Sequence, residues 1–278
     1  MIKVYKTIAG AVIFANNKFY ACTMLWDDLI NRDSLHAFLT NEIKSLPLVE
    51  QPRANEIQAP VGSQEVWASG VTYFRSKEAR MDESKKSGAS VFYDKVYDAE
   101  RPELFFKSSA SRVVADGGTV HIRKDSTWNV PEPELTLYIN SRGNIAGYTI
   151  GNDMSSRSIE GENPLYLPQA KTYDRSASIG PCLLVTETPI SPDTTISMQI
   201  SRQGKMMYED KVQISMMKRK HDELAGFLFR EMNFPTGCFL MTGTCLVPGS
   251  EFTLAVGDDV KISIEGIGTL NNKIGQRA

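Results

Sequence analysis

The 278-residue sequence has no apolar run long enough to cross a membrane, and its net charge of −2 leaves no excess of basic residues. A membrane span needs about 18 or more apolar residues in a row, so no membrane segment is expected. Nucleic-acid binding depends on a positively charged surface and is not expected either. The one dense basic run, residues 218–221, is followed at once by Asp222 and Glu223, which is typical of a solvated helix start.

Cysteine and histidine are scarce, with four and three residues respectively. The cysteines form no C-x-x-C pair, which argues against the usual thiolate zinc site. The first residues also lack the apolar stretch and the cleavage site of a signal peptide. A cytoplasmic protein with reduced thiols is therefore expected.

The first 60 residues predict a small domain of strands and one helix. Short alternating segments are typical of strands, at residues 4–8, 11–15 and 18–22. Apolar residues at helical spacing predict a helix that starts at Asp33 or Ser34 and extends to Ile43. Three prolines then interrupt a polar stretch, so we predict a boundary near residue 60, between an N-terminal domain (1–60) and a larger domain (61–278).

The larger domain is mostly strand-like, with a hairpin around the turn Gln203-Gly204 and a helix at residues 222–232. Carboxy-terminal strands are expected at residues 252–256, 260–264 and 267–270. The charged segment from Tyr73 to Lys86 fits either a mobile lid or a solvated surface helix.

The stretch most informative of function is a Pro-Glu-Pro-Glu sequence that contains Glu132 and Glu134. Residues two apart share one face of a strand, so both side chains point the same way. If Arg142-Gly143 is a two-residue turn, the following strand brings Asp153 directly opposite Glu132. Three carboxylates on one face repel one another unless a divalent cation neutralises them, which predicts a magnesium site, with manganese and calcium as alternatives. The alternative without a metal is a solvated edge strand.

Several motifs, in order along residues 60–270, resemble the fumarylacetoacetate hydrolase family. They are Glu132-Pro133-Glu134-Leu135, the segment at residues 147–157, Lys171-Thr172-Tyr173-Asp174 and Ile179-Gly180-Pro181. Residues 96–103 and 162–169 are most similar to the 2-keto-3-deoxy-D-arabinonate dehydratase branch of that family. The hydrolase branch usually carries a histidine in the stretch that matches residues 73–78, and its absence here disfavours hydrolysis.

The resemblance implies a mainly β (α+β) fold, in which a distorted β-roll catalytic domain follows the small N-terminal domain. It implies that Glu132, Glu134 and Asp153 hold the metal, in agreement with the strand register above. It also implies homodimers or homotetramers. On the same ground alone, Thr244 and Lys107 are expected near substrate oxygens.

A 2-keto acid binds a metal through its carboxylate and keto oxygens, and this stabilises the enolate formed when a C3 proton leaves. Lys171 is expected next to that carbon, either as base or as a charged group that steadies the enolate. Glu78 and Glu160 are candidate acids for the hydroxyl that leaves C4. Arg157, four residues past Asp153, is a candidate for binding the substrate carboxylate in a helical turn, with an ion pair to a neighbouring acid as the alternative.

The expected activity is magnesium-dependent dehydration of a 2-keto-3-deoxy sugar acid, from 2-keto-3-deoxy-arabinonate to 2,5-dioxopentanoate. Acylpyruvate hydrolysis or oxaloacetate decarboxylation at the same site is the first alternative. A non-catalytic protein that binds a keto acid or a metal is the second. The presence of Lys171 favours an enzyme over this second alternative, since binding alone needs no proton-transfer group.

Overall fold

The computed structural model describes residues 1–74 and 95–278, so most of the predicted lid, with Glu78, lies outside the described residues. In the part that is described, the chain is mainly β with short helices, as the sequence predicts. None of the helices in these ranges has both the length and the apolar character needed to cross a membrane.

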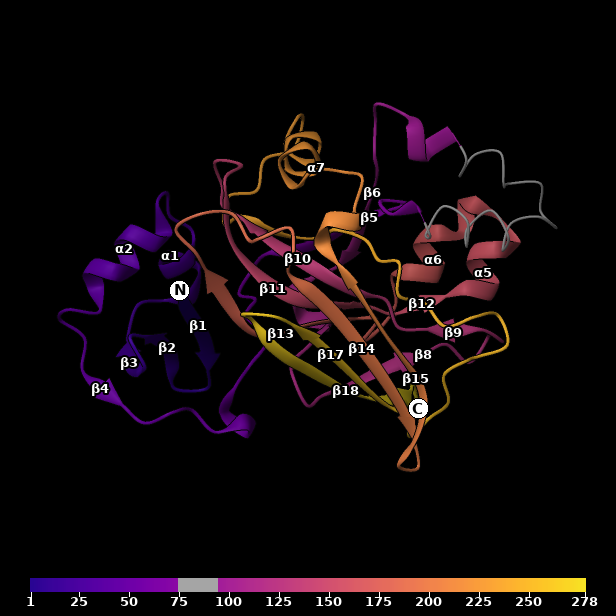
Figure 1. Ribbon diagram of the computed structural model, residues 1–278, viewed down its shortest axis with the longest axis horizontal. Helices are drawn as coiled ribbons and strands as arrows, with labels where there is room; N and C mark the ends of the chain where they lie inside the picture. The colour runs from indigo at the N-terminus through magenta and orange to yellow at the C-terminus, as the bar shows by residue number, and fades with distance from the viewer. Residues whose placement is uncertain (75–94) are drawn as a thin grey trace.

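One large sheet runs through most of the molecule (Figure 1). Its strand order is β4-β3-β2-β1-β13-β11-β10-β16-β5-β6, and β7 pairs with β13. These strands are β1 (Ile2–Thr7), β2 (Gly10–Ala15), β3 (Lys18–Cys22), β4 (Leu48–Val49), β5 (Glu65–Gly70), β6 (Glu103–Ser108), β7 (Val113–Val114), β10 (Pro133–Ile139), β11 (Ile145–Asp153), β13 (Ala177–Val185) and β16 (Cys238–Met241).

A second sheet of five strands, in the order β15-β14-β17-β18-β8, packs beside the first, and β9 and β12 form a separate pair. Their bounds are β8 (Thr119–Ile122), β9 (Asn129–Val130), β12 (Ser155–Ser156), β14 (Thr195–Arg202), β15 (Lys205–Gln213), β17 (Asp259–Ile264) and β18 (Gly268–Gln276). The predicted hairpin turn is confirmed, because Gln203 and Gly204 both have positive φ between β14 and β15.

Helices are few and short, and they lie around the sheets rather than between them (Figure 1). They are α1 (Trp26–Ile30), α2 (Leu35–Glu42), α5 (Arg157–Glu162), α6 (Leu167–Lys171) and α7 (His221–Leu228). The helix predicted up to Ile43 is confirmed as α2. Ser34 occupies its N-cap position but makes no capping hydrogen bond with its side chain.

The N-terminal strands continue the sheet that carries the rest of the fold. β1 pairs antiparallel with β13, with Val4 opposite Leu183. Both residues belong to one core cluster that also includes Phe239 from β16. The segments before and after residue 60 therefore share a sheet and a core, and the domain boundary at that residue stays a prediction.

Two expected elements differ from the structure. The helix predicted at residues 222–232 ends at Leu228, because the ring of Phe234 packs on Phe229 with centroids 4.9 Å apart and the chain must turn to bring them together. The strand predicted at residues 252–256 is absent from the described fold. That segment is held instead by isolated hydrogen bonds to Asn129, whose strand β9 pairs with β12.

The basic run before α7 is not the fully solvated helix start that the sequence predicts. Lys218 and Lys220 are exposed, but Arg219 is only 8% exposed. The guanidinium of Arg219 donates to backbone carbonyls of residues 96, 99 and 100. Arg219 is buried because of these long-range contacts, which the local charge pattern does not predict.

Candidate active site

The hairpin formed by β10 and β11 brings the predicted metal ligands together. Pro133 lies opposite Asn152, and the backbone N–H of Asp153 donates to the carbonyl of Glu132 at 2.9 Å. Asp153 is therefore opposite Glu132, as predicted. The predicted two-residue turn is wrong, because the loop spans residues 140–144 and Ile139 pairs with Ile145. A bulge at Ala146 adds one residue to β11 and restores the expected register.

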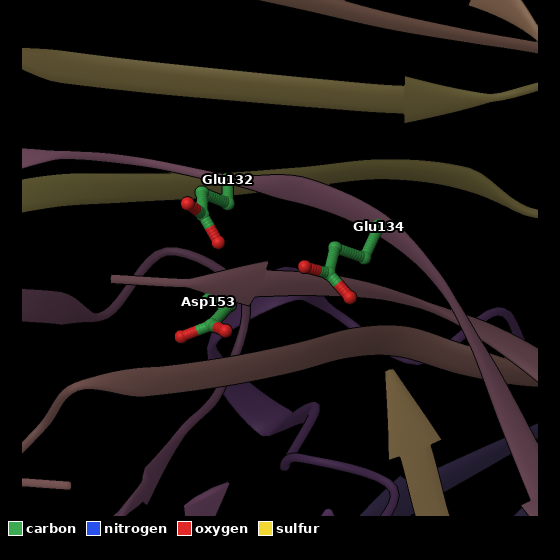
Figure 2. Close-up of side chains that lie close together, drawn as sticks. All are labelled: Glu132, Glu134 and Asp153. Carbon is green, nitrogen blue, oxygen red and sulfur yellow. The ribbon is translucent and has the colours of Figure 1, made fainter. Parts of the chain in front are cut away.

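The carboxylates of Glu132, Glu134 and Asp153 point toward one another from this hairpin (Figure 2). One oxygen from each lies within 4.8 Å of the others. All three side chains are buried, at no more than 3% exposure. Buried carboxylates at this spacing repel strongly, so the fold holds them together only where positive charge is close by.

Lys171, at the end of α6, is one source of that positive charge. Its ammonium lies 2.5 Å from Glu132 Oε2 and 3.2 Å from Asp153 Oδ2, and it donates to Ser155 Oγ at 2.6 Å. The side chain is 1% exposed, and Phe105 packs with its ring centroid 5.6 Å from Nζ. Lys171 is therefore not a solvated surface lysine.

Lys107, on β6, lies behind Asp153 and contacts it at 2.5 Å through Oδ1. Its ammonium also donates to the carbonyls of Met154, at 2.9 Å, and of Lys171. The ammonium therefore lies against one carboxylate and two backbone carbonyls. Burial lowers the pKa of Lys107, and the Asp153 carboxylate opposes that shift. The position fits a residue that fixes Asp153 and the end of α6, rather than the substrate contact that the sequence predicts.

Arg157 begins α5 and contacts two acids. Its Nη2 binds Glu132 Oε1, and its Nη1 lies 3.7 Å from Glu160 Oε2. Both Arg157 and Glu160 are buried. The expected helical turn from Asp153 to Arg157 is wrong, because Asp153 ends β11 and the helix starts only at Arg157. The ion-pair alternative is the arrangement that the structure contains.

Glu134 differs from the other two carboxylates in the groups that surround its charge. Its Oε2 accepts a hydrogen bond of 2.6 Å from the backbone N–H of Gly243, and across residues 1–74 and 95–278 no salt bridge reaches it. Burial raises the pKa of Glu134 well above its usual range, and the carboxylates of Asp153 and Glu132 add to the shift. Lys171 and the Gly243 N–H oppose it.

A cavity of about 110 Å³ opens onto this cluster. Six of the predicted site residues line it, namely Glu132, Glu134, Asp153, Arg157, Lys171 and Thr244. Lys107 and Glu160 do not belong to its wall. The rest of the wall includes Phe105, Val71 and Gly243.

Three of the site's contact groups were not predicted. Phe105 lines the cavity beside Lys171. Ser155 accepts a hydrogen bond from Lys171, and the N–H of Gly243 donates to Glu134. Ser155 lies two residues after Asp153, so its closeness to the ligand strand was readable from the sequence, whereas the Gly243 contact joins strands over a hundred residues apart.

The residues present fit a hard divalent cation. The donor set consists of three carboxylates, which are the ligands that magnesium prefers. Glu134 in particular is a buried acid with a raised pKa, and within residues 1–74 and 95–278 it forms no ion pair. A bound cation would relieve the cost of burying this carboxylate.

The comparisons with known proteins agree with this geometry. The model of the fumarylacetoacetate (FAA) hydrolase C-terminal region matches residues 66–275. A probable 2-keto-3-deoxyxylonate dehydratase from Haloferax volcanii is 51% identical over 216 residues, which are 77% of this chain and 73% of that protein. The 2-dehydro-3-deoxy-D-arabinonate dehydratase from Saccharolobus solfataricus is 40% identical over 223 residues, which are 80% of this chain and 75% of that protein.

A solved structure described as 2-keto-3-deoxy-D-arabinonate dehydratase complexed with magnesium and 2,5-dioxopentanoate has the same fold. It superimposes with a TM-score of 0.83 at 32% identity, over 99% of each chain. The family model spans most of this chain, and its matched residues include the carboxylate hairpin and Lys171. The chain therefore belongs to the fumarylacetoacetate hydrolase family.

Proposed function

We propose that the protein is a magnesium-dependent dehydratase that converts 2-keto-3-deoxy-arabinonate to 2,5-dioxopentanoate. The observation that carries the proposal is the convergence of three buried carboxylates beside a buried lysine in the wall of one cavity. The relatives described above, which are named as dehydratases of 2-keto-3-deoxy sugar acids, support the same substrate class.

Glu132, Glu134 and Asp153 would hold the magnesium ion, with manganese or calcium as alternatives. Magnesium bound there would polarise the keto group and offset the negative charge that develops as C3 loses a proton. Lys107 keeps Asp153 in place through its buried ion pair, and Gly243 does the same for Glu134 through its N–H. Such supporting contacts orient metal ligands and tune their affinity.

Lys171 is the group that takes the C3 proton. It lines the cavity next to two of the metal ligands, and Ser155 fixes the direction of its amine. A neutral amine accepts the proton from C3, and the electrons of the C–H bond form the C2–C3 double bond of the enolate. The enolate then expels the C4 hydroxyl, which leaves as water after it gains a proton.

The elimination product reaches 2,5-dioxopentanoate when C5 loses a proton, C3 gains one and the resulting enol becomes the aldehyde. The carboxylate of the acid that protonated the departing hydroxyl takes the C5 proton. The protonated amine of Lys171 stands beside C3 and can return a proton there. The proposed acid for the departing hydroxyl is Glu78 or Glu160. Glu160 is absent from the cavity wall and contacts Arg157, so it suits a residue that orients Arg157.

Arg157 and Thr244, which both line the cavity, are proposed to contact the substrate. A guanidinium is well suited to a carboxylate because it presents two parallel N–H groups. Arg157 would release part of its contact with Glu132 when that carboxylate binds the metal. Lys107, expected near substrate oxygens, lies outside the cavity wall against Asp153, so we propose that it supports this ligand.

The test is incubation of the purified protein with magnesium and 2-keto-3-deoxy-arabinonate, with the aldehyde product followed by NMR. Formation of 2,5-dioxopentanoate that stops on addition of a chelator is the expected result. The variant Asp153→Asn should lose this activity and magnesium binding together. Turnover of an acylpyruvate or of oxaloacetate, without any aldehyde from the sugar acid, would instead favour the hydrolase or decarboxylase alternative.

We also propose that the enzyme acts in the cytoplasm as a homodimer or homotetramer. All four cysteines lie in the described ranges, and no disulfide joins them, which suits a reducing compartment. Light scattering of the purified protein tests the subunit number, and a mass of one chain would contradict it.

A further inference from the structure

Val71 forms part of the cavity wall in a conformation that valine rarely adopts. Its φ is +54°, in the left-handed region, where the branched side chain clashes with its own backbone. The residue is nevertheless only 4% exposed, and it lines the cavity that holds the carboxylates. A strained residue of this kind persists only where surrounding contacts hold it, and such residues cluster at functional sites.

The backbone after Val71 is fixed on two sides. Thr72 donates from Oγ1 to the carbonyl of Thr242 at 2.7 Å, and its own carbonyl accepts from the N–H of Lys218 at 2.9 Å. Tyr73 then forms an antiparallel bridge with Met217. The segment just before α7 therefore holds the backbone that follows the cavity wall.

The side chain of Val71 is covered by Val96 and Tyr97, which pack against it in a small separate cluster. These residues belong to the segment at 96–103 that resembles the dehydratase branch in sequence. Through their contact with Val71, the residues of that motif pack against the cavity wall.

Lys218 and Arg219 hold this covering segment through long-range contacts. The Lys218 ammonium donates to the carbonyl of Tyr97 at 2.7 Å, lies 2.5 Å from Asp98 Oδ1 and stands 4.1 Å from the centroid of the Tyr97 ring. The segment is thereby tied to the same stretch of chain that fixes Thr72.

Arg219 adds contacts that a lysine cannot reproduce. Its Nη2 donates to the carbonyls of Val96, at 3.1 Å, and Ala99, at 2.5 Å, while its Nη1 donates to the carbonyl of Glu100 at 3.1 Å. Glu223 neutralises the guanidinium at 2.5 Å. The planar, forked guanidinium spreads its donors over several acceptors, which a single ammonium cannot do.

We propose that Lys218 and Arg219 are positioning residues, which press the segment at residues 96–100 onto Val71 and so fix the substrate side of the cavity. Neither residue touches a carboxylate that lines the cavity. Their effect passes through Val71, which sets the position of the substrate relative to Lys171. This inference rests on the proposed dehydratase function.

The test compares Arg219→Lys and Lys218→Ala with the matched control Lys220→Ala, which changes the exposed neighbour in the same basic run. Each variant is measured for kcat and KM with 2-keto-3-deoxy-arabinonate, for magnesium affinity and for thermal stability. Arg219→Lys should lower kcat/KM on the order of tenfold, because small misplacements at a reacting centre cost at least this much. Magnesium affinity should stay unchanged, and Lys220→Ala should match the wild type.

A double-mutant cycle with Val71→Gly shows whether Arg219 acts through Val71. Glycine accepts positive φ without strain and removes the side chain that the segment covers. In the Val71→Gly background, Arg219→Lys should lower kcat/KM by less than about twofold, since coupled residues are not additive. Arg219→Lys with wild-type kinetics, or with its full effect in both backgrounds, would overturn the inference while an active wild type leaves the dehydratase proposal standing. An inactive wild type overturns the dehydratase proposal, and the inference with it.

Discussion

Lys171 lies between two acids that it must share with a metal ion. Its ammonium bridges Glu132 and Asp153, so in the metal-free protein it partly supplies the positive charge that the carboxylates need. A cation bound by the same carboxylates would compete with it electrostatically. The lysine is thus placed where metal binding favours the neutral amine that proton abstraction requires.

Replacing Lys171 with methionine should separate catalysis from metal binding. We expect turnover to fall by roughly 10² to 10⁴, the usual contribution of a general base. Magnesium affinity, measured by titration calorimetry, should rise, because no ammonium competes for the carboxylates, while the melting temperature in chelator should fall. Lys220→Met, at an exposed position, is the control. A variant that retained turnover would remove Lys171 from its proposed role.

The raised pKa of Glu134 predicts how the stability of the folded protein depends on pH. Its pKa is raised in the folded protein, so between about pH 4.5 and that raised value the folded state keeps a proton that the unfolded state has released. The metal-free protein should therefore lose stability as the pH rises through this interval. Magnesium requires the ionised carboxylate, so its stabilising effect should increase over the same interval.

Melting temperatures in chelator and in magnesium, at about pH 5 and about pH 8, measure this difference. In Glu134→Gln the amide keeps its size and still accepts the Gly243 hydrogen bond, but it has no charge to titrate. The variant should bind magnesium weakly and lose most of the pH dependence. Equal pH dependence in the variant would mean that another group is responsible.

At the scale of secondary structure, the β10–β11 hairpin shows how much the sequence can predict. Alternation along the strand correctly predicted that Glu132 and Glu134 share a face, and the register correctly placed Asp153. The turn did not follow the prediction, and the bulge at Ala146 compensated for the longer loop. Local patterns fix the pairing of neighbouring strands well, since a one-residue slip would turn every side chain to the other face of the sheet.

Contacts between distant segments were beyond the sequence patterns. The burial of Lys107 and Arg219 depends on partners far along the chain, and neither residue type nor spacing indicates it. A basic run beside acidic residues has the same local pattern whether it is solvated or anchors another segment. The roles of these two residues therefore emerged only from the packing.

Gly243, in the connection after β16, should tolerate no side chain. Its φ is +93°, and a Cβ there would lie 2.1 Å from Thr72 Oγ1 and 2.9 Å from the carbonyl of Ser69. Gly243→Ala should move the N–H away from Glu134 and weaken magnesium binding by about tenfold or more. Calorimetry measures the change.

The matched control for this substitution is Gly204→Ala. Gly204 also has positive φ, at +78°, but a Cβ there would meet nothing within 4 Å. It should therefore lose a little stability from backbone strain and keep normal magnesium affinity. Equal affinity losses in both variants would show that strain, rather than displacement of the N–H, weakens the site.

At the scale of the whole molecule, the N-terminal segment is an integral part of the main sheet. Removing residues 1–60 would expose the edge of β13 and open the core cluster that contains Val4 and Leu183. We expect residues 61–278 alone to show no cooperative thermal transition by circular dichroism, because the truncated core can no longer offset the loss of chain entropy. A cooperative transition, together with magnesium binding, would instead support an independent domain at residue 60.

The four cysteines lie in different parts of the molecule, so their chemical modification can be used to follow unfolding. Cys22 lies in one core cluster, Cys182 and Cys238 lie in the other, and Cys245 borders the catalytic cavity. Because all are shielded from solvent, an alkylating reagent can modify them only when the surrounding structure opens. The order in which the four thiols are labelled would thus map which part of the fold opens first, without any engineered probe.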